Sequence, residues 1–120
     1  MAISKIQYNP IVVESGYNTK GFYRKWSDGT LEQWSRGVMA TGASSGNVQT
    51  SIAFPIPFLD TTYALMVLGQ SNVISGTTIA ENQYSNGSAN RTVNSTQISF
   101  YKTGNAYAQY FSWYAIGKWK

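Results

Sequence analysis

The chain has 120 residues, of which 42% are hydrophobic and 15% aromatic, which is enough apolar area for the core of one domain but not of two. Nine basic and five acidic residues give a formal net charge of +4, and no basic run is long enough to follow a phosphate backbone, which argues against a nucleic-acid partner. The absence of cysteine and histidine excludes disulfides, thiol nucleophiles, imidazole bases and nearly all transition-metal sites, so we expect neither a metal nor a cofactor.

The N-terminal residues give the first indication of where the protein works. They lack the long apolar core of a signal peptide, and no apolar run in the chain approaches the ~18 residues of a membrane span. We therefore expect a protein without membrane insertion that is made in a cytoplasm and reaches the outside of cells by lysis, as virus particles do.

The remaining pattern is that of β-structure. No window has the i, i+3, i+4 apolar spacing of a helix, whereas β-branched and aromatic residues recur in short runs separated by Gly, Asn, Ser and Asp. After a segment of uncertain form through Val13, the predicted strands lie near residues 21–27, 30–36, 47–54, 62–69, 72–80, 96–102 and 109–117. The sequence therefore predicts a domain that is almost all β.

The first two predicted strands form a hairpin around Asp28-Gly29, a dipeptide that favours a two-residue type I′ turn. With that turn, the predicted cross-strand pairs are Ser27 with Thr30, Trp26 with Leu31, Lys25 with Glu32, Arg24 with Gln33 and Tyr23 with Trp34. One face then carries Trp26 beside Leu31, and the other carries the Lys25–Glu32 ion pair. Such pairs contribute roughly 0.2–1 kcal/mol each, so they specify the register more than they stabilise the fold.

Two prolines interrupt the chain in Phe54-Pro55-Ile56-Pro57-Phe58. Because they remove two backbone donors, this segment is predicted to leave a strand or to lie at an edge, with both phenylalanines packed in the core. The apolar run from Tyr63 to Leu68 that follows is predicted to be buried on both faces.

Polar composition predicts loops at residues 41–47 and 82–94. The last residues, from Tyr110 to Lys120, read as a strand that reaches almost to the chain end, so the C-terminus is predicted to be part of the sheet.

Three landmarks in this order and spacing carry a family resemblance. They are the hairpin Trp26-Ser27-Asp28-Gly29-Thr30-Leu31-Glu32-Gln33-Trp34, the element Phe54-Pro55-Ile56-Pro57-Phe58, and the ending Ser112-Trp113-Tyr114-Ala115-Ile116-Gly117-Lys118-Trp119. Over residues ~20–120 the chain resembles the C-terminal receptor-binding tip domain of bacteriophage and prophage tail fibres, which is also found in phage-derived bacteriocin particles. The division that follows is an N-terminal segment at 1–20, as a fibre connection or extension, and a tip domain at 21–120.

The resemblance implies a small antiparallel β-sandwich, similar in fold to the trimeric H-type lectins that bind N-acetylgalactosamine. It also implies a homotrimer at the distal end of the virion's tail fibre, joined to the remainder of the fibre, with host recognition as its task. Such domains usually end a much longer polypeptide, so the chain is either an excised domain or a short gene product. Fibre tips that bind iron through a His-x-His motif are a different group, since this chain has no histidine.

The implied partner is a bacterial cell-surface polysaccharide, such as lipopolysaccharide, or an outer-membrane receptor. Aromatic rings stack on sugar faces, while amides and arginine supply hydrogen bonds, and the positive charge adds a salt-sensitive attraction toward acidic polysaccharide. The candidate ligand-binding residues, all in the long loop or before the last strand, are Tyr84, Asn86, Asn90, Arg91, Asn105, Tyr107 and Gln109.

Two alternatives stay open. The chain has only five carboxylates for a glycan depolymerase, namely Glu14, Asp28, Glu32, Asp60 and Glu81, and the hairpin already uses two of them. The interpretation is therefore a protein that is not an enzyme. A structural cap that ends and registers a trimeric fibre, without receptor contact, would have the same core and featureless loops.

Overall fold

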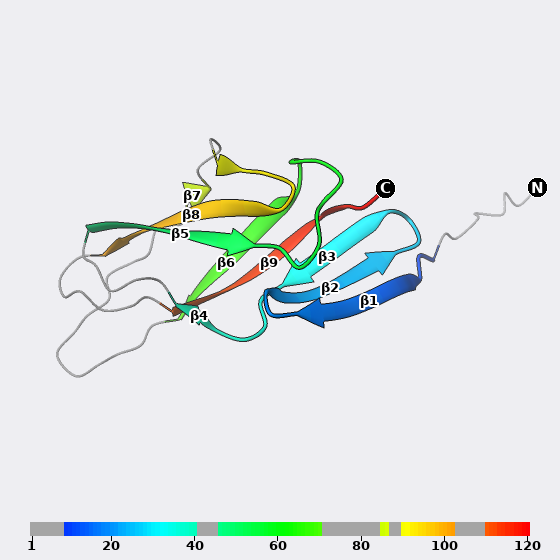
Figure 1. Ribbon diagram of the computed structural model, residues 1–120, viewed down its shortest axis with the longest axis horizontal. Helices are drawn as coiled ribbons and strands as arrows, with labels where there is room; N and C mark the ends of the chain where they lie inside the picture. The colour runs from blue at the N-terminus through cyan, green and yellow to red at the C-terminus, as the bar shows by residue number, and fades with distance from the viewer. Residues whose placement is uncertain (1–8, 41–45, 71–84, 87–89, 103–109) are drawn as a thin grey trace, which may run out of the picture.

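The computed structural model describes residues 9–40, 46–70, 85–86, 90–102 and 110–120, and these form nine β-strands (Figure 1). The strands are β1 (Val12–Asn18), β2 (Gly21–Trp26), β3 (Thr30–Trp34), β4 (Met39–Ala40), β5 (Gly46–Ala53), β6 (Ala64–Gln70), β7 (Ser85–Asn86), β8 (Ser95–Lys102) and β9 (Tyr110–Lys118). None of the described residues belongs to a helix that is long and apolar enough to cross a membrane.

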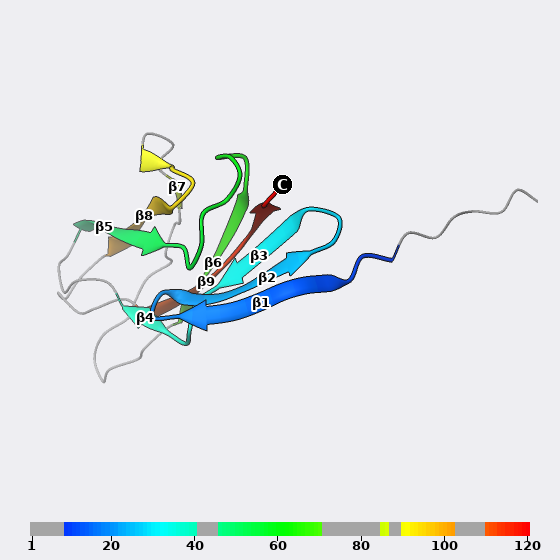
Figure 2. The same ribbon diagram turned by 45° about the vertical axis from the view of Figure 1, so that its right-hand side comes forward.

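The strands form two antiparallel sheets. The larger sheet has six strands in the order β1-β2-β3-β9-β4, with β6 also paired to β9, and the smaller sheet has the order β5-β8-β7. In both ribbon views the smaller sheet lies beside the β6 and β9 side of the larger one, and β1 is the far edge (Figures 1 and 2). The predicted all-β antiparallel sandwich is confirmed.

Six predicted strands are confirmed to within two residues at each end, and the predicted strand at 72–80 lies outside the described residues. β1, β4 and β7 were not predicted as strands. β1 pairs with β2 along its length, with an irregularity between Val12 and Glu14, so residues before the hairpin contribute to the larger sheet. Of the predicted loops, residues 41–45, 82–84 and 87–89 lie outside the described part, while residues 46–47 begin β5 and residues 85–86 form β7.

The hairpin forms where it was predicted, but its register is wrong by one residue. Its connection has three residues, 27–29, and the Gly29 N–H donates to the Trp26 carbonyl at 3.0 Å. Gly29 has φ of +94°, whereas no described residue other than glycine has a positive φ. Asp28 instead accepts the Thr30 N–H at 2.9 Å. A three-residue loop that ends in a left-handed glycine thus spares Asp28 the strain that a type I′ turn would impose.

The shift changes which side chains share a face. Arg24 lies opposite Glu32, and Lys25 lies opposite Leu31. The predicted Lys25–Glu32 pair is therefore wrong: the Lys25 ammonium instead lies 3.2 Å from the Glu14 carboxylate on β1. Leu31 faces the core and is fully buried.

Residues from both sheets and from the proline element make one core. Its buried members are Leu31, Ile52, Phe54, Phe58, Tyr63, Ile98, Phe111, Trp113 and Ala115. The ring of Phe54 meets those of Phe58, Tyr63 and Trp113 edge-on, with centroids 4.9–5.6 Å apart. The prediction that Phe54 and Phe58 anchor the proline segment in the core is confirmed.

One buried polar side chain joins the proline element to the larger sheet. Gln33 on β3 donates its amide N–H to the Ile56 carbonyl and accepts the Ile56 N–H, both at 3.0 Å. Because Pro55 and Pro57 have no N–H, Ile56 holds the one backbone donor between them, and Gln33 satisfies it.

The prediction that β6 is buried on both faces is wrong. Leu65 and Val67 pack against the core, but Met66 is 58% and Leu68 70% exposed. The smaller sheet and the proline element cover one face of the larger sheet, so every second residue of β6 points away from the core.

The C-terminus is built into the sheet, as predicted. β9 lies between β3 and β6, and Trp119 closes the end of the hairpin by donating its backbone N–H to the Gly29 carbonyl and its indole N–H to the Trp26 carbonyl, both at 2.9 Å.

Candidate functional site

The face of the larger sheet that points away from the core carries two rows of directly opposed side chains. From β1 to β6, the first row is Tyr17, Phe22, Trp34, Tyr114 and Met66. The second row is Ser15, Arg24, Glu32, Ile116 and Ala64. Opposed residues of neighbouring strands share a face, so aromatic, charged and apolar side chains form one continuous surface, which we call the open face.

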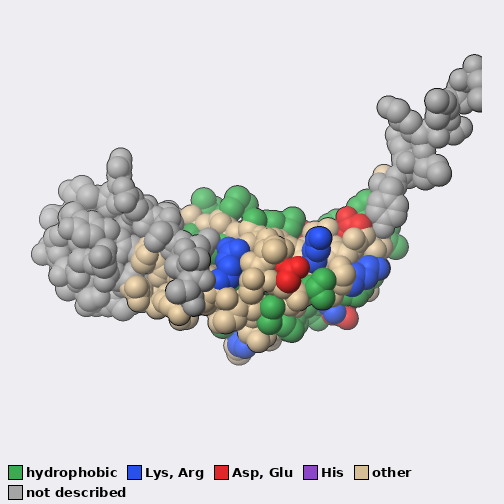
Figure 3. All heavy atoms as spheres, turned by 90° about the horizontal axis from the view of Figure 1, so that it is seen from above, with side chains coloured by type: hydrophobic (Ala, Val, Ile, Leu, Met, Phe, Trp, Pro, Cys, Tyr) green, Lys and Arg blue, Asp and Glu red, His purple; other side chains and the backbone are tan. Residues whose placement is uncertain are grey.

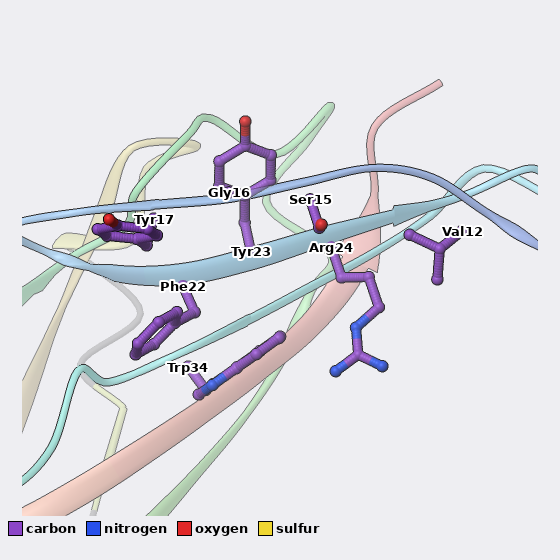
Figure 4. A pocket seen from close by; sticks show the side chains of 8 residues that line it. All are labelled: Val12, Ser15, Gly16, Tyr17, Phe22, Tyr23, Arg24 and Trp34. Atoms are coloured by element: carbon purple, nitrogen blue, oxygen red, sulfur yellow. The ribbon is translucent and has the colours of Figure 1, made fainter.

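Part of the open face is hollowed over β1, β2 and β3. Figure 4 shows Phe22, Trp34 and Arg24 pointing to the same side of the hairpin, while Tyr23 points to the other side. These residues, with Tyr17 and residues of β1, line a groove of about 420 Å³, which we call the hairpin groove. That volume is in the range of small-molecule sites.

Three aromatic rings form the floor of the hairpin groove. The Tyr17 and Phe22 ring centroids lie 5.7 Å apart with a 45° tilt, and those of Phe22 and Trp34 lie 5.8 Å apart with planes only 15° from parallel. Tyr17 is 65% exposed, whereas Phe22 and Trp34 are half-buried. The result is a row of three aromatic side chains that remain partly exposed to solvent.

A guanidinium group lies at each end of this row. The Arg24 guanidinium carbon lies 5.0 Å from the Trp34 ring centroid and 5.8 Å from that of Trp26. The Arg36 guanidinium carbon lies 5.1 Å from the Tyr17 centroid. Cation–π contacts of this kind are worth about 0.5–1 kcal/mol at exposed sites, so they orient the two charges rather than bury them.

Glu32 lies beside the groove and connects Arg24 to side chains of neighbouring strands. Its carboxylate accepts hydrogen bonds from the Trp26 indole N–H and the Tyr114 hydroxyl, and one oxygen lies 3.9 Å from Arg24 Nε. Burial raises the pKa of Tyr114 to about 12, helped by its hydrogen bond to Glu32 and by the charge of that carboxylate. This network fixes Trp26, Arg24 and Tyr114 before any ligand arrives.

Charges elsewhere are dispersed. In the view of Figure 3, basic and acidic side chains are scattered over the described surface and form no basic stripe. The described residues contain no cluster of three or more potential metal ligands.

The predicted binding residues lie elsewhere. Tyr84, Asn105, Tyr107 and Gln109 are outside the described residues, and Asn86 is described only by its backbone, opposite Ile98. Asn90 and Arg91, whose side chains are described, do not line the hairpin groove. Whether any of the seven residues binds a ligand stays a prediction.

The two predicted residues with described side chains support the fold. The exposed Asn90 donates to the Gln97 side chain. Arg91 donates to the carbonyls of Thr61 at 3.0 Å and Tyr63 at 2.6 Å, and its guanidinium carbon lies 4.2 Å from the Tyr63 ring centroid. Arg91 thus ties the segment before β8 to the segment before β6.

The groove residues Tyr17, Phe22, Arg24 and Trp34 were not among the predicted ligand-binding residues. Their signal was present in the second arm of the hairpin, where Glu32, Trp34 and Arg36 occupy every second position. The wrong register hid it, because it placed Trp34 opposite Tyr23 instead of Phe22.

Comparison with known proteins identifies a family. A family model for the C-terminal domain described as "tail fiber protein gp53-like, C-terminal" matches residues 25–118. No curated protein matches the sequence.

Solved structures share the fold. A structure of C-terminal residues of the P. aeruginosa R2 pyocin fiber is 22% identical, with a TM-score of 0.59, over 88% of this chain and 25% of that one. An N-truncated R1-type pyocin tail fiber is 19% identical, with a TM-score of 0.60, over 87% of this chain and 84% of that one. The chain thus spans about a quarter of the R2 fiber structure.

Proposed function

The chain belongs to the gp53-like family of tail fibre C-terminal domains, and we propose that it is the receptor-binding end of a fibre, attaching a particle to a bacterial surface glycan. The observation that carries this proposal is the hairpin groove, whose floor of partly exposed aromatic side chains suits the C–H faces of a sugar. Ser15 and Arg24 at its side can supply hydrogen bonds to sugar hydroxyls.

We propose that the domain works as a homotrimer. Support comes from the β6–β9 part of the open face, where Met66, Leu68 and Ile116 are 58%, 70% and 38% exposed. Exposed apolar side chains grouped in this way are typical of interaction surfaces. Three glycan sites on one fibre would gain avidity without any new contact, so weak binding by each site suffices.

We propose binding without catalysis. Each of the four carboxylates in the described part of the chain has a structural partner. Glu14 pairs with Lys25, Asp28 and Asp60 accept the N–H groups of Thr30 and Thr62, and Glu32 holds Trp26 and Tyr114. None of them is left to act as the free acid or base of a glycosidase.

The proposed place of work is the tail fibre of a particle made in the cytoplasm of its bacterial host, attached to the remainder of the fibre. The exposed apolar side chains of Met66, Leu68 and Ile116 also favour a second function, a cap that ends and registers a trimeric fibre without touching the receptor. The two functions differ in whether the isolated domain recognises cells.

The test measures solution mass by light scattering and then the binding of fluorescently labelled protein to bacterial cells with and without their surface polysaccharide. We expect a trimer that binds intact cells and loses binding when the polysaccharide is removed. A monomer would contradict the trimer, and a trimer that binds no cell across a broad panel of hosts would favour the cap.

A further inference from the structure

Arg24, which lines the hairpin groove, and Arg36, whose guanidinium lies over the neighbouring Tyr17 ring, both keep hydrogen-bond donors without an acceptor among the described residues. Arg24 contacts Glu32 only through Nε, at 3.9 Å, and the described residues give its two terminal nitrogens no acceptor. Arg36, which is exposed, has no hydrogen bond or ion pair with the described residues, and its guanidinium lies over the Tyr17 ring. Arg91, by contrast, already donates two hydrogen bonds to the backbone.

The nearby acidic groups do not neutralise both arginines. Glu32 accepts hydrogen bonds from Trp26 and Tyr114 and faces Arg24, so it offsets one positive charge. Glu14 pairs with Lys25 and does not line the groove. A net positive charge therefore remains beside the aromatic row.

The rings between the arginines define the rest of the ligand. Arg24 covers part of Trp34, and Arg36 approaches Tyr17, so Phe22 lies at the centre of the row with a guanidinium group on either side. A ligand that fits has a flat apolar face and an anionic substituent at its edge, because rings attract C–H surfaces while guanidinium groups bind carboxylate or phosphate.

We propose that the hairpin groove binds an acidic saccharide unit, with its ring on Phe22 and its carboxylate or phosphate held by Arg24 or by Arg36. This inference rests on the proposed glycan-binding function and names both the site and the charge of the sugar. It puts recognition on the face of the larger sheet, apart from the segment around Arg91.

The experiment compares three probes of matched length on the full chain by calorimetric titration. They are a galacturonic acid oligosaccharide, a phosphorylated mannose oligosaccharide and a neutral galactose oligosaccharide. The first two distinguish carboxylate from phosphate as the anion. We expect at least one of them to bind at least tenfold more tightly than the neutral probe, with weaker binding as ionic strength rises from about 0.05 M to about 0.5 M.

Two variants test the site. Arg36→Gln removes an exposed charge from a loop and leaves folding intact, and Arg24→Gln removes the charge beside Trp34. At least one of them is expected to weaken binding of the acidic probe by about tenfold, since it removes the charge-assisted contact, and the affected variant shows which arginine holds the anion. Lys118→Gln, which removes the same charge from an exposed position outside the groove, is the control and is expected to change affinity less than twofold.

Three results would overturn the inference. They are equal affinity for acidic and neutral probes, no binding of either acidic probe at millimolar concentration, and unchanged affinity in both arginine variants. The cell-binding assay separates this failure from that of the proposed function. If the wild type binds cells through polysaccharide and the arginine variants bind equally well, the fibre tip recognises glycan by another surface.

Discussion

The two faces of the larger sheet use the same strands for different purposes. On the covered face, Leu31 and Ala115 are fully buried, and Gln33 has its amide hydrogen-bonded to Ile56. On the open face, Arg24 and Trp34 are half-buried, and the guanidinium keeps donors without partners among the described residues. Unused hydrogen-bonding capacity beside partly exposed rings is therefore what distinguishes the open face from the face built for packing.

The largest expected effect tests this comparison with one substitution made on each face. Leu31→Ala removes a fully buried side chain and is expected to lower the free energy of unfolding by about 2–5 kcal/mol, through lost burial and the cavity left behind. Leu68→Ala, at a position 70% exposed, is expected to cost the protomer about 0.5 kcal/mol or less.

Urea unfolding of both variants gives the values, and light scattering shows whether Leu68→Ala weakens self-association. Equal losses of protomer stability would mean that the two faces are equally covered.

A smaller effect is expected from the polar residue of the covered face. Gln33→Leu keeps the side-chain volume but leaves the Ile56 N–H and C=O without partners, which is expected to cost about 2–4 kcal/mol. Gln49→Leu is the control, because Gln49 is exposed and its side chain bonds only that of Gln97 among the described residues. Denaturant unfolding measures both, and a stability for Gln33→Leu within about 0.5 kcal/mol of wild type would show that Gln33 does not hold the proline element.

Sequence alone predicted most of the strands because their alternation is local. It did not predict the hairpin register, because Asp28-Gly29 is compatible with loops of two or three residues. The choice depends on whether Asp28 takes a positive φ or accepts the Thr30 N–H. This small difference decided whether Leu31 or Glu32 shared a face with Trp26.

The candidate site was harder to predict than the strands. The polar composition of the loop at 82–94 led to the prediction that Arg91 binds a ligand. Its guanidinium instead donates to the backbone carbonyls of Thr61 and Tyr63, which are distant in sequence. The prediction that β6 is buried on both faces was wrong because it also depended on tertiary structure. An apolar run in the sequence does not show whether a second layer covers the other face of the strand. Met66 and Leu68 lie on the face without one.

The smallest expected effect concerns how far the open face is removed from water. Burial, and then the hydrogen bond to Glu32 and its charge, raise the pKa of Tyr114 from its ordinary 10.0 to about 12 in the folded protein. Between these values the folded chain holds a proton that the unfolded chain has lost, so stability falls as pH rises through this window. Below pH 10 the contribution is fully present.

Tyr114→Phe removes the ionisable hydroxyl. Between about pH 9 and about pH 11.5, the free energy of unfolding measured in urea is therefore expected to fall less for this variant than for wild type. The stability difference between the two proteins should shrink as pH rises, because the hydrogen bond that wild type gains from Glu32 disappears on ionisation. Tyr17→Phe is the control, since that exposed hydroxyl bonds no described residue, and its stability should follow that of wild type. A difference that stayed constant with pH would mean that Tyr114 and Glu32 are as hydrated as the rim of the groove, and that the open face has no ordered network to orient Arg24.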